Sequence, residues 1–173
     1  MIAVTTPFRV EVLDAHDRTH FACGVAALDE YFRTRVTQDI KRRVANCFVV
    51  VEAASGKVAG FYTLSSASVP LNELPEAVVK KLPRYPSIPA VRIGRLAIDI
   101  PFQGKGLGAA MLADAATKAM QDSAAAFALL VDAKDDKGAQ FYEHEGFVRL
   151  DASPLTLFLP LETVRRAREA PGR

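Results

Sequence analysis

The sequence predicts a single α/β domain, and three observations lead to this prediction. Strand-like and helix-like segments alternate along 173 residues, a length that suits one domain with its own hydrophobic core. Apolar residues make up 50% of the chain and charged residues 24%, which is typical of globular proteins and argues against disorder. No internal repeat or linker-like stretch interrupts the pattern, so we expect one domain over residues 1–173.

The N-terminal part of the chain is expected to form one strand and two helices. Residues 8–13 alternate between apolar and polar side chains, as a half-buried strand does. A helix is expected over residues 26–32. A second helix is expected to end at Arg43, with Thr34 as its N-cap, because a threonine hydroxyl can accept a hydrogen bond from a free amide of the first turn.

A β-hairpin and a proline-rich segment are expected to follow. The run of β-formers over residues 47–51, the Ser-Gly turn at 55–56 and the strand-like residues 58–68 predict the hairpin. Residues 70–90 then hold five of the ten prolines, so we interpret them as an insertion with a short helix at 75–82 and otherwise extended loop.

The C-terminal half is predicted to add strands and helices in alternation. Residues 91–98 form a buried strand, 107–120 a helix and 127–131 a central strand that is apolar throughout. A helix ending at His144 follows, capped by Asp135 or Asp136 and stopped by Gly146. Two final strands are expected at 147–150 and 155–161, and the tail 162–173 is expected to be a frayed helix at most.

A glycine-rich turn between the predicted strand 91–98 and the next helix is the clearest candidate site. Glycines at 104, 106 and 108 let the backbone approach an anion closely, and a helix N-terminus offers unpaired amides and partial positive charge. The spacing matches neither a Walker A loop nor a dinucleotide-binding fingerprint. The sequence therefore predicts a pyrophosphate-binding turn rather than a mere flexible connector.

Basic side chains are concentrated in a few segments although the net charge is only +2. The first segment holds Arg33, Arg35, Lys41, Arg42 and Arg43. The second holds Lys80, Lys81, Arg84, Arg92 and Arg95, and the C-terminal end adds Arg165, Arg166, Arg168 and Arg173. Such patches on a near-neutral protein indicate a polyanionic ligand, with solvated helix faces as the alternative interpretation.

The two cysteines and the absence of an export signal bear on the compartment. Cys23 and Cys47 match no zinc-binding spacing, and we expect no metal site. Because no signal peptide and no membrane-spanning run is recognisable, we expect reduced thiols in a cytoplasmic protein without membrane contact.

The glycine-rich turn resembles a known motif. Gln103-x-x-Gly106-x-Gly108, preceded by Ile98, is similar to motif A of the GNAT acetyltransferases. The resemblance implies a mixed, mostly antiparallel central sheet flanked by helices, and acetyl-CoA as co-substrate. It also implies a CoA site, in which strand residues bind the pantetheine arm and the turn binds the pyrophosphate, made of Leu96, Ala97, Ile98, Gln103, Gly104, Lys105, Gly106, Leu107 and Gly108.

The run Gly138 to Phe147 resembles motif B of the same family, in which the tyrosine corresponds to Tyr142. A phenol with a pKa of about 10 is protonated at neutral pH and can donate a proton to the departing CoA thiolate. The alternative is a core tyrosine whose hydroxyl bonds to the backbone, but Phe141 is expected to supply the packing. We interpret Glu143 and His144 as surface residues, and a dedicated base is not required for a neutral α-amine.

A narrower resemblance covers nearly the whole chain. It rests on Cys23-Gly24, Gln38-Asp39-x-Lys41-Arg42, Gly60-Phe61-Tyr62-Thr63-Leu64-Ser65, Leu82-Pro83-Arg84-Tyr85-Pro86, Gly94-Arg95-Leu96-Ala97, Leu130-Val131-Asp132-Ala133 and Leu155-Thr156-Leu157-Phe158-Leu159-Pro160. These segments are similar to those of GNAT toxins from type II toxin–antitoxin modules. The resemblance implies acetylation of the α-amine of aminoacyl-tRNA, a block of translation, a ribbon-helix-helix antitoxin and a homodimer.

The resemblance and the basic segments together suggest which residues contact the tRNA, because lysine and arginine side chains grip phosphates. The expected contacts are Arg35, Lys41, Arg42, Arg43, Lys80, Lys81, Arg84, Arg92 and Arg95. Arg95, on the strand next to the expected CoA site, could instead orient the acceptor end. The proline-rich insertion is expected to shape either the acceptor pocket or a dimer contact. Two other functions stay open at this point: a GNAT enzyme acting on a small-molecule amine, and a non-catalytic module that binds CoA or protein.

Overall fold

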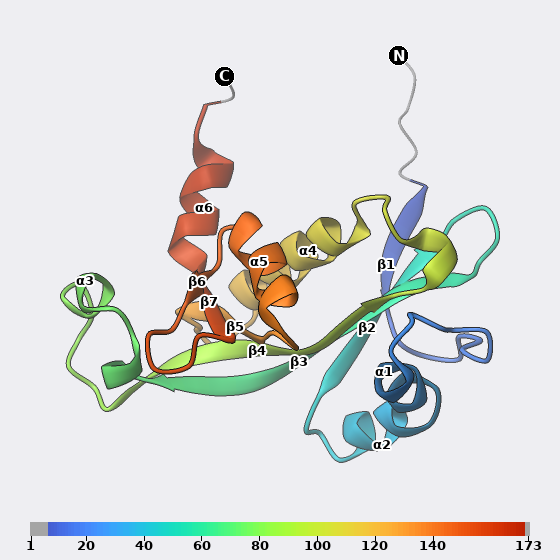
Figure 1. Ribbon diagram of the computed structural model, residues 1–173, viewed down its shortest axis with the longest axis horizontal. Coiled ribbons are helices and arrows are strands. Elements are labelled where there is room, and N and C mark those ends of the chain that lie inside the picture. Colours follow the sequence, from blue (N-terminus) through green and yellow to red (C-terminus); the bar gives the residue numbers. More distant parts are fainter. Residues whose placement is uncertain (1–6, 172–173) are drawn as a thin grey trace. The chain divides into compact units, whose positions relative to one another are not determined.

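The structure, a computed structural model, describes residues 7–171 (Figure 1). Within these residues the strands form one sheet in the order β1-β2-β3-β4-β5-β7-β6. The strands are β1 (Phe8–Val12), β2 (Asn46–Glu52), β3 (Val58–Pro70), β4 (Ser87–Ile98), β5 (Ala128–Asp132), β6 (Val148–Arg149) and β7 (Thr156–Pro160). The helices are α1 (Ala26–Glu30), η1 (Tyr31–Arg35), α2 (Val36–Lys41), η2 (Leu71–Glu73), α3 (Glu76–Val79), η3 (Ile100–Phe102), α4 (Leu107–Gln121), α5 (Asp136–His144) and α6 (Leu161–Glu169).

The sheet is mixed and mostly antiparallel, which confirms the expected fold class. β1 pairs with β2, β2 with β3, β5 with β7 and β6 with β7, all antiparallel. β4 and β5 run parallel, with α4 in the connection between them, as a parallel pair requires. The apolar strand β5 is flanked on both sides, in agreement with its predicted central place.

The chain forms two compact units, each with its own core. The first comprises the residues up to Leu64 together with Arg95–Asp114, and the second comprises Ser65–Gly94 and Ala115 onward. In the first core Phe32 stacks on Phe61 with ring centroids 4.2 Å apart, and Phe21 meets both rings edge-on. The second core consists of Val69, Leu74, Ala90, Ala128, Leu130, Leu150 and Phe158.

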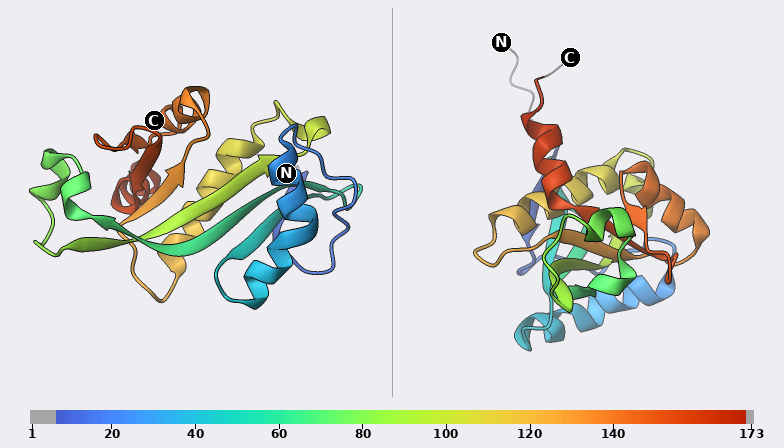
Figure 2. Two further views of the ribbon diagram at one scale, coloured as in Figure 1. Left: turned by 60° about the horizontal axis from the view of Figure 1, so that its bottom comes forward. Right: turned by 90° about the vertical axis from the view of Figure 1, so that its left-hand side faces the viewer.

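The two predicted N-terminal helices are one continuous helix, coloured blue to cyan in Figure 2. α1 runs through a π-helical turn, η1, directly into α2. The prediction of Thr34 as an N-cap is therefore wrong: its hydroxyl donates to the carbonyl of Glu30 at 2.7 Å, within the helix. The π turn buries two consecutive aromatic residues, Tyr31 and Phe32, in the first core.

The proline-rich insertion is shorter than expected because both flanking strands extend into it. β3 continues to Pro70 and β4 begins at Ser87, so the segment between them is only the tip of a long hairpin. The predicted helix 75–82 is reduced to α3, and the rest includes the 3-10 turn η2. Pro70 and Pro89 lie in the two strands, where the extended backbone suits proline, whereas Pro75, Pro83 and Pro86 lie in the segment that connects the strands.

The C-terminal tail is more ordered than predicted. α6 is a regular helix from Leu161 to Glu169, and the last two residues of the predicted tail lie outside the described residues. Leu161 is buried, and Arg165 bonds to Glu162 and Glu169 one turn away on either side. The guanidinium of Arg168 donates to the Thr117 hydroxyl of α4 at 2.7 Å. These contacts stabilise α6, which the highly charged sequence of the tail did not predict as a regular helix.

Gly60 of β3 marks the tightest packing in the first unit. A Cβ atom added there would lie 3.0 Å from the carbonyl oxygen of Ala97 and 3.2 Å from the sulfur of Met111. The first contact is with the backbone of β4 and the second with the side chain of α4. Glycine therefore lets β4 and α4, which the glycine-rich turn connects, approach β3 closely.

Replacing Gly60 with alanine is expected to lower the free energy of unfolding by about 1–3 kcal/mol, the usual range for overpacking. Urea denaturation followed by circular dichroism measures the change. Ser66→Ala, at an exposed position of the same strand, is the matched control and should leave the midpoint nearly unchanged. An unchanged midpoint for Gly60→Ala would show that the neighbouring backbone yields without cost.

Candidate active site

The glycine-rich turn presents free backbone amides at the start of a long helix. β4 ends at Ile98, η3 follows, and the fifteen-residue helix α4 begins at Leu107. Gly104 and Gly106 adopt φ angles of 77° and 80°, the left-handed region that favours glycine. Within the described part of the chain, the amides of residues 104–108 donate no hydrogen bond. Free amides beside a helix N-terminus form an anion cradle.

Side-chain hydrogen bonds hold this turn in place. The amide nitrogen Nε2 of Gln103 donates to the carbonyls of Cys23 at 2.8 Å and Ile98 at 2.9 Å. The Gln103 side chain thus ties the turn to the end of β4 and to the segment before α1. Its role is to shape the cradle, whereas the sequence had suggested only that it belongs to the binding motif.

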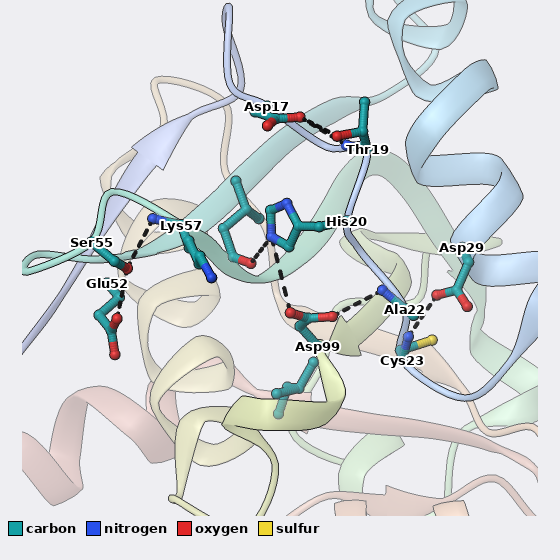
Figure 3. A network of polar contacts seen from close by, with 12 residues as sticks. Asp17, Thr19, His20, Ala22, Cys23, Asp29, Glu52, Ser55, Lys57 and Asp99 are labelled. Atoms are coloured by element: carbon teal, nitrogen blue, oxygen red, sulfur yellow. Dashed lines mark hydrogen bonds and ion pairs between the residues drawn. The ribbon is translucent and has the colours of Figure 1, made fainter.

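Asp99 also holds the segment before α1, as Figure 3 shows. Its carboxylate is 3% exposed; one oxygen accepts the amide of Ala22 at 2.9 Å and the other lies 4.0 Å from Nε2 of His20. The carboxylate of Asp29 in α1 accepts the amide of Cys23 at 2.7 Å. Sequence reasoning missed both aspartates, since their partners are only recognisable once the chain has folded.

Helix α4 is fixed against β3 by a partly buried hydrogen bond. The Tyr62 hydroxyl donates to the carboxylate of Asp114, two turns into the helix. Tyr62 is fully buried, and burial, followed by the nearby carboxylate, raises the pKa of its phenol. The N-terminus of α4, which points into the turn, is therefore held at a defined position in the first unit.

Tyr142 lies on α5 in the second unit and is half-buried. Its ring meets Phe147 edge-on at 5.5 Å, and burial raises the pKa of the phenol to about 12. Among the described residues its hydroxyl has no hydrogen-bond partner, yet no buried side-chain oxygen of this part of the chain is unpaired. The hydroxyl therefore reaches the surface, which argues against the core tyrosine bonded to backbone.

The neighbours of Tyr142 fit the sequence analysis except for one. Asp135 caps α5 by accepting the amide of Gly138 at 2.9 Å, and Gly146 ends it with a φ of 98°. The expectation that Phe141 supplies the packing is wrong, because it is 36% exposed while Phe147 is buried.

Neither side chain beside Tyr142 is placed as a base. Glu143 is ion-paired with Arg149 at 2.8 Å, and His144 is exposed. Both remain surface residues, as interpreted from the sequence.

The predicted tRNA-binding residues fall into both units and differ in their contacts. In the first unit Lys41, Arg42 and Arg43 are exposed where α2 ends, and Arg35 pairs with Glu30. The Arg95 guanidinium lies 3.5 Å from the ring centroid of Tyr31. In the second unit Lys80, Lys81 and Arg84 are exposed, whereas Arg92 is half-buried and ion-paired with Asp132.

Other candidate chemistry is weak in the part of the chain that the structure describes. No group of three metal-ligating side chains occurs there, and none of its helices is long and apolar enough to cross a membrane. Burial raises the pKa of the Cys47 thiol to about 12, so the thiolate that reacts or binds metal is disfavoured.

A hollow of about 780 Å³ lies at the hairpin tip of the second unit. It is lined by Pro70, Leu71, Asn72, Leu74, Glu76, Val79, Tyr85, Pro86 and Asp151. The segment that was predicted as a proline-rich insertion thus lines a surface depression of the second unit.

Comparison with known proteins places this geometry in a family. The acetyltransferase (GNAT) domain matches residues 22–155. A tRNA-acetylating toxin of Mycobacterium tuberculosis is 35% identical over 95% of this chain and 97% of its own length. The probable toxin TacT of Sinorhizobium fredii is 30% identical over 90% and 92% of the two chains.

Solved structures agree over nearly the full length. AtaT complexed with acetyl-methionyl-tRNAfMet has a TM-score of 0.84 at 29% identity, covering 93% of this chain and 99% of that one. AtaTR bound with acetyl-CoA has a TM-score of 0.77 at 28% identity, covering 94% and 98%. A tyrosine-to-phenylalanine variant of AtaT bound to the C-terminus of the antitoxin AtaR has a TM-score of 0.79 at 25% identity, covering 95% and 100%. This chain belongs to the GNAT family of acetyltransferases.

Proposed function

We propose that this chain is a toxin that transfers the acetyl group of acetyl-CoA to the α-amino group of aminoacyl-tRNA. The observation that carries the proposal is the match, over 95% of the chain, to a tRNA-acetylating toxin. The shared fold with AtaT in complex with acetyl-methionyl-tRNA supports it. An acetylated α-amine has lost the nucleophilic lone pair needed for peptide-bond formation, so the modification blocks translation.

The co-substrate supplies an acetyl thioester, and the first unit provides the groups to hold it. The free amides of Gly104, Lys105, Gly106, Leu107 and Gly108 are suited to the pyrophosphate, and the Lys105 side chain adds positive charge. Gln103 holds the turn that carries these amides through its two hydrogen bonds. Leu96, Ala97 and Ile98, at the end of β4, are assigned to the pantetheine arm.

Tyr142 is assigned the role of general acid. Transfer of the acetyl group breaks the bond between carbonyl carbon and sulfur, and the departing thiolate takes a proton. A phenol whose pKa is raised to about 12 by burial stays protonated at neutral pH, and its hydroxyl is not occupied by a protein acceptor among the described residues. The proton lost by the attacking amine passes to water.

The tRNA is assigned to the basic residues of both units. They are Arg35, Lys41, Arg42, Arg43, Lys80, Lys81, Arg84, Arg92 and Arg95, all of which carry charge for phosphate contacts. Arg92 is the weakest member, because Asp132 already neutralises it. A ribbon-helix-helix antitoxin, a homodimer and a cytoplasmic location complete the proposal, in line with the antitoxin-bound structure of AtaT.

Tyr142→Phe is expected to lower the rate of acetyl transfer to aminoacyl-tRNA by about 10²–10⁴-fold, the usual contribution of a general acid. Affinity for acetyl-CoA, measured by calorimetry, should stay within a factor of two or three, on the order of 0.5 kcal/mol. The assay follows radiolabelled acetyl transfer to charged tRNA, with deacylated tRNA as control. Full activity of the variant would remove Tyr142 from the mechanism, and no label on any charged tRNA would favour a small-molecule amine.

The pH profile of the wild type should rise and then stay level up to about pH 10. The rise reflects loss of the amine proton, whose pKa is about 8 or lower. Because burial raises the Tyr142 pKa, the acid form is kept below pH 10 and is lost only as pH passes through about 12. Initial rates corrected for ester hydrolysis give the profile, and a decline between pH 8 and 10 would contradict the assignment.

Gly106→Ala is expected to weaken acetyl-CoA binding about 10-fold or more, since moving one amide of the cradle loses on the order of 1.4 kcal/mol. Alanine at a φ of 80° is strained by about 1–2 kcal/mol. Gly56→Ala is the matched control, because Gly56 has a φ of 72° and equally open surroundings in the β2–β3 turn. Comparable loss of stability with unequal loss of affinity supports the cradle; equal affinities would refute it.

A further inference from the structure

Arg95 of β4 is held flat on an aromatic platform. Its guanidinium carbon lies 3.5 Å from the centroid of the Tyr31 ring. At this distance the guanidinium plane must lie nearly parallel to the ring, because an edge-on nitrogen would enter the van der Waals radius of the ring carbons. A guanidinium in this orientation directs its N–H groups outward past the rim of the ring.

Hydrogen bonds hold both the Tyr31 ring and the backbone of Arg95. Tyr31 is 6% exposed, and its hydroxyl donates to the Asp39 carboxylate at 2.7 Å. The acceptor carboxylate adds electron density to the ring and so strengthens its attraction for a cation. On the other side, the Arg95 amide donates to the Thr63 hydroxyl at 3.0 Å, which fixes the backbone that carries the guanidinium.

The outward N–H groups of Arg95 have no acceptor in the protein. No hydrogen bond or ion pair joins its guanidinium to another residue within 7–171. Arg18 shows the contrast: it also lies over an aromatic ring, but it donates to the Phe32 carbonyl at 2.7 Å and to Thr37 at 3.2 Å. Arg18 is a structural arginine, whereas Arg95 is preorganised for a ligand that brings its own acceptors.

The position of Arg95 indicates what that ligand is. Arg95 directly precedes Leu96–Ile98, at the end of this stretch that points away from the pyrophosphate turn. If the pantetheine arm follows Leu96–Ile98, as the proposed function requires, Arg95 lies near the thioester end. On an aminoacyl-tRNA the anion nearest to the reacting α-amine is the last phosphodiester of the acceptor end. A planar guanidinium binds such a group through two parallel hydrogen bonds.

We propose that Arg95, stacked on the Tyr31 ring that Asp39 holds in place, binds the 3′-terminal phosphodiester of the acceptor end and thereby places the α-amine for attack. Arg95 is the binding residue, and Tyr31 and Asp39 are positioning residues. The exposed Lys41, Arg42 and Arg43 at the end of α2 add positive charge to the same unit, which suits a polyanion better than an isolated carboxylate. The inference rests on the proposed function.

Two short substrates test the contact with the full-length protein. One is a 3′-aminoacyl-adenosine, which has no phosphodiester; the other is an aminoacyl-CCA trinucleotide, which has the terminal one. For the wild type, kcat/KM for the trinucleotide should exceed that for the adenosine ester. In Arg95→Lys this ratio should fall by about 10-fold or more, the worth of a bidentate charge-assisted pair. The loss should appear mainly in KM for the trinucleotide, while KM for acetyl-CoA stays within about threefold, on the order of 0.7 kcal/mol.

Tyr31 variants separate positioning from folding. Tyr31→Phe keeps the ring and should retain most of the ratio, while Tyr31→Leu should lose it as Arg95→Lys does. Arg33→Lys, an exposed arginine of the same helical turn, is the matched control and should keep the ratio. Thermal melting and acetyl-CoA binding show that each variant is folded.

The outcomes are distinct. An Arg95→Lys variant with an unchanged ratio overturns the inference and leaves the proposed function intact; this is also the result expected if the guanidinium meets a carboxylate of a protein partner. A loss confined to KM for acetyl-CoA overturns it in favour of a CoA contact. If the wild type acetylates neither substrate nor charged tRNA, the proposed function fails and the inference fails with it.

Discussion

The site depends on one constraint: a backbone that must stay unpaired and yet hold its shape. Binding an anion through amides requires that those amides have no partner in the protein, and residues 104–108 meet this condition. No regular hydrogen-bond ladder can then stabilise the turn. The restraint comes from side chains instead: Gln103 bridges to two carbonyls and Asp99 anchors the segment before α1. Of these acceptors the buried Asp99 carboxylate is charged, and hydrogen bonds to a charged acceptor are the stronger kind.

The same reasoning extends to the helix behind the turn. Gly60 allows β3 to approach both β4 and α4, and the hydrogen bond from Tyr62 to Asp114 fixes α4 along its axis. Because the buried Tyr62 hydroxyl donates to a carboxylate, it has a hydrogen-bond partner, and this bond offsets the unfavourable free energy of removing the hydroxyl from water. The position of the helix N-terminus, which is the proposed pyrophosphate site, is thus determined by contacts two turns further along the helix.

The sequence predicted what is encoded locally and failed where contacts are distant. Glycine spacing indicated the turn, and Asp135 and Gly146 marked the ends of α5, because each acts on its own neighbours. The π-helical turn could not be foreseen from the sequence. It buries Tyr31 and Phe32 in succession, which is favourable only because Arg95 stacks on Tyr31 and Phe61 stacks on Phe32. Phe141 was misjudged because sequence does not tell which of two adjacent rings faces the core.

Three arginines show most clearly that the sequence does not reveal the contacts of a side chain. Arg18, Arg92 and Arg95 carry the same charge, but the first bonds to carbonyl and hydroxyl, the second to a carboxylate, and the third only stacks on a ring. Arginines that contribute equally to the net charge therefore differ in their ability to bind a ligand. Only an arginine without a protein acceptor has all its N–H groups available for phosphate.

The proposed mechanism, in which water takes the proton of the attacking amine, has a selectivity of its own. Glu143 is ion-paired and His144 is exposed, so neither side chain beside Tyr142 is placed to act as a base. At pH 7 an α-amine with a pKa of about 8 is neutral roughly 200-fold more often than a lysine side chain with a pKa of about 10.4. If Tyr142 is the acid, kept protonated by burial, and no side chain acts as base, the site favours the weakly basic amine of an aminoacyl ester over protein lysines before any contact with the substrate discriminates between them.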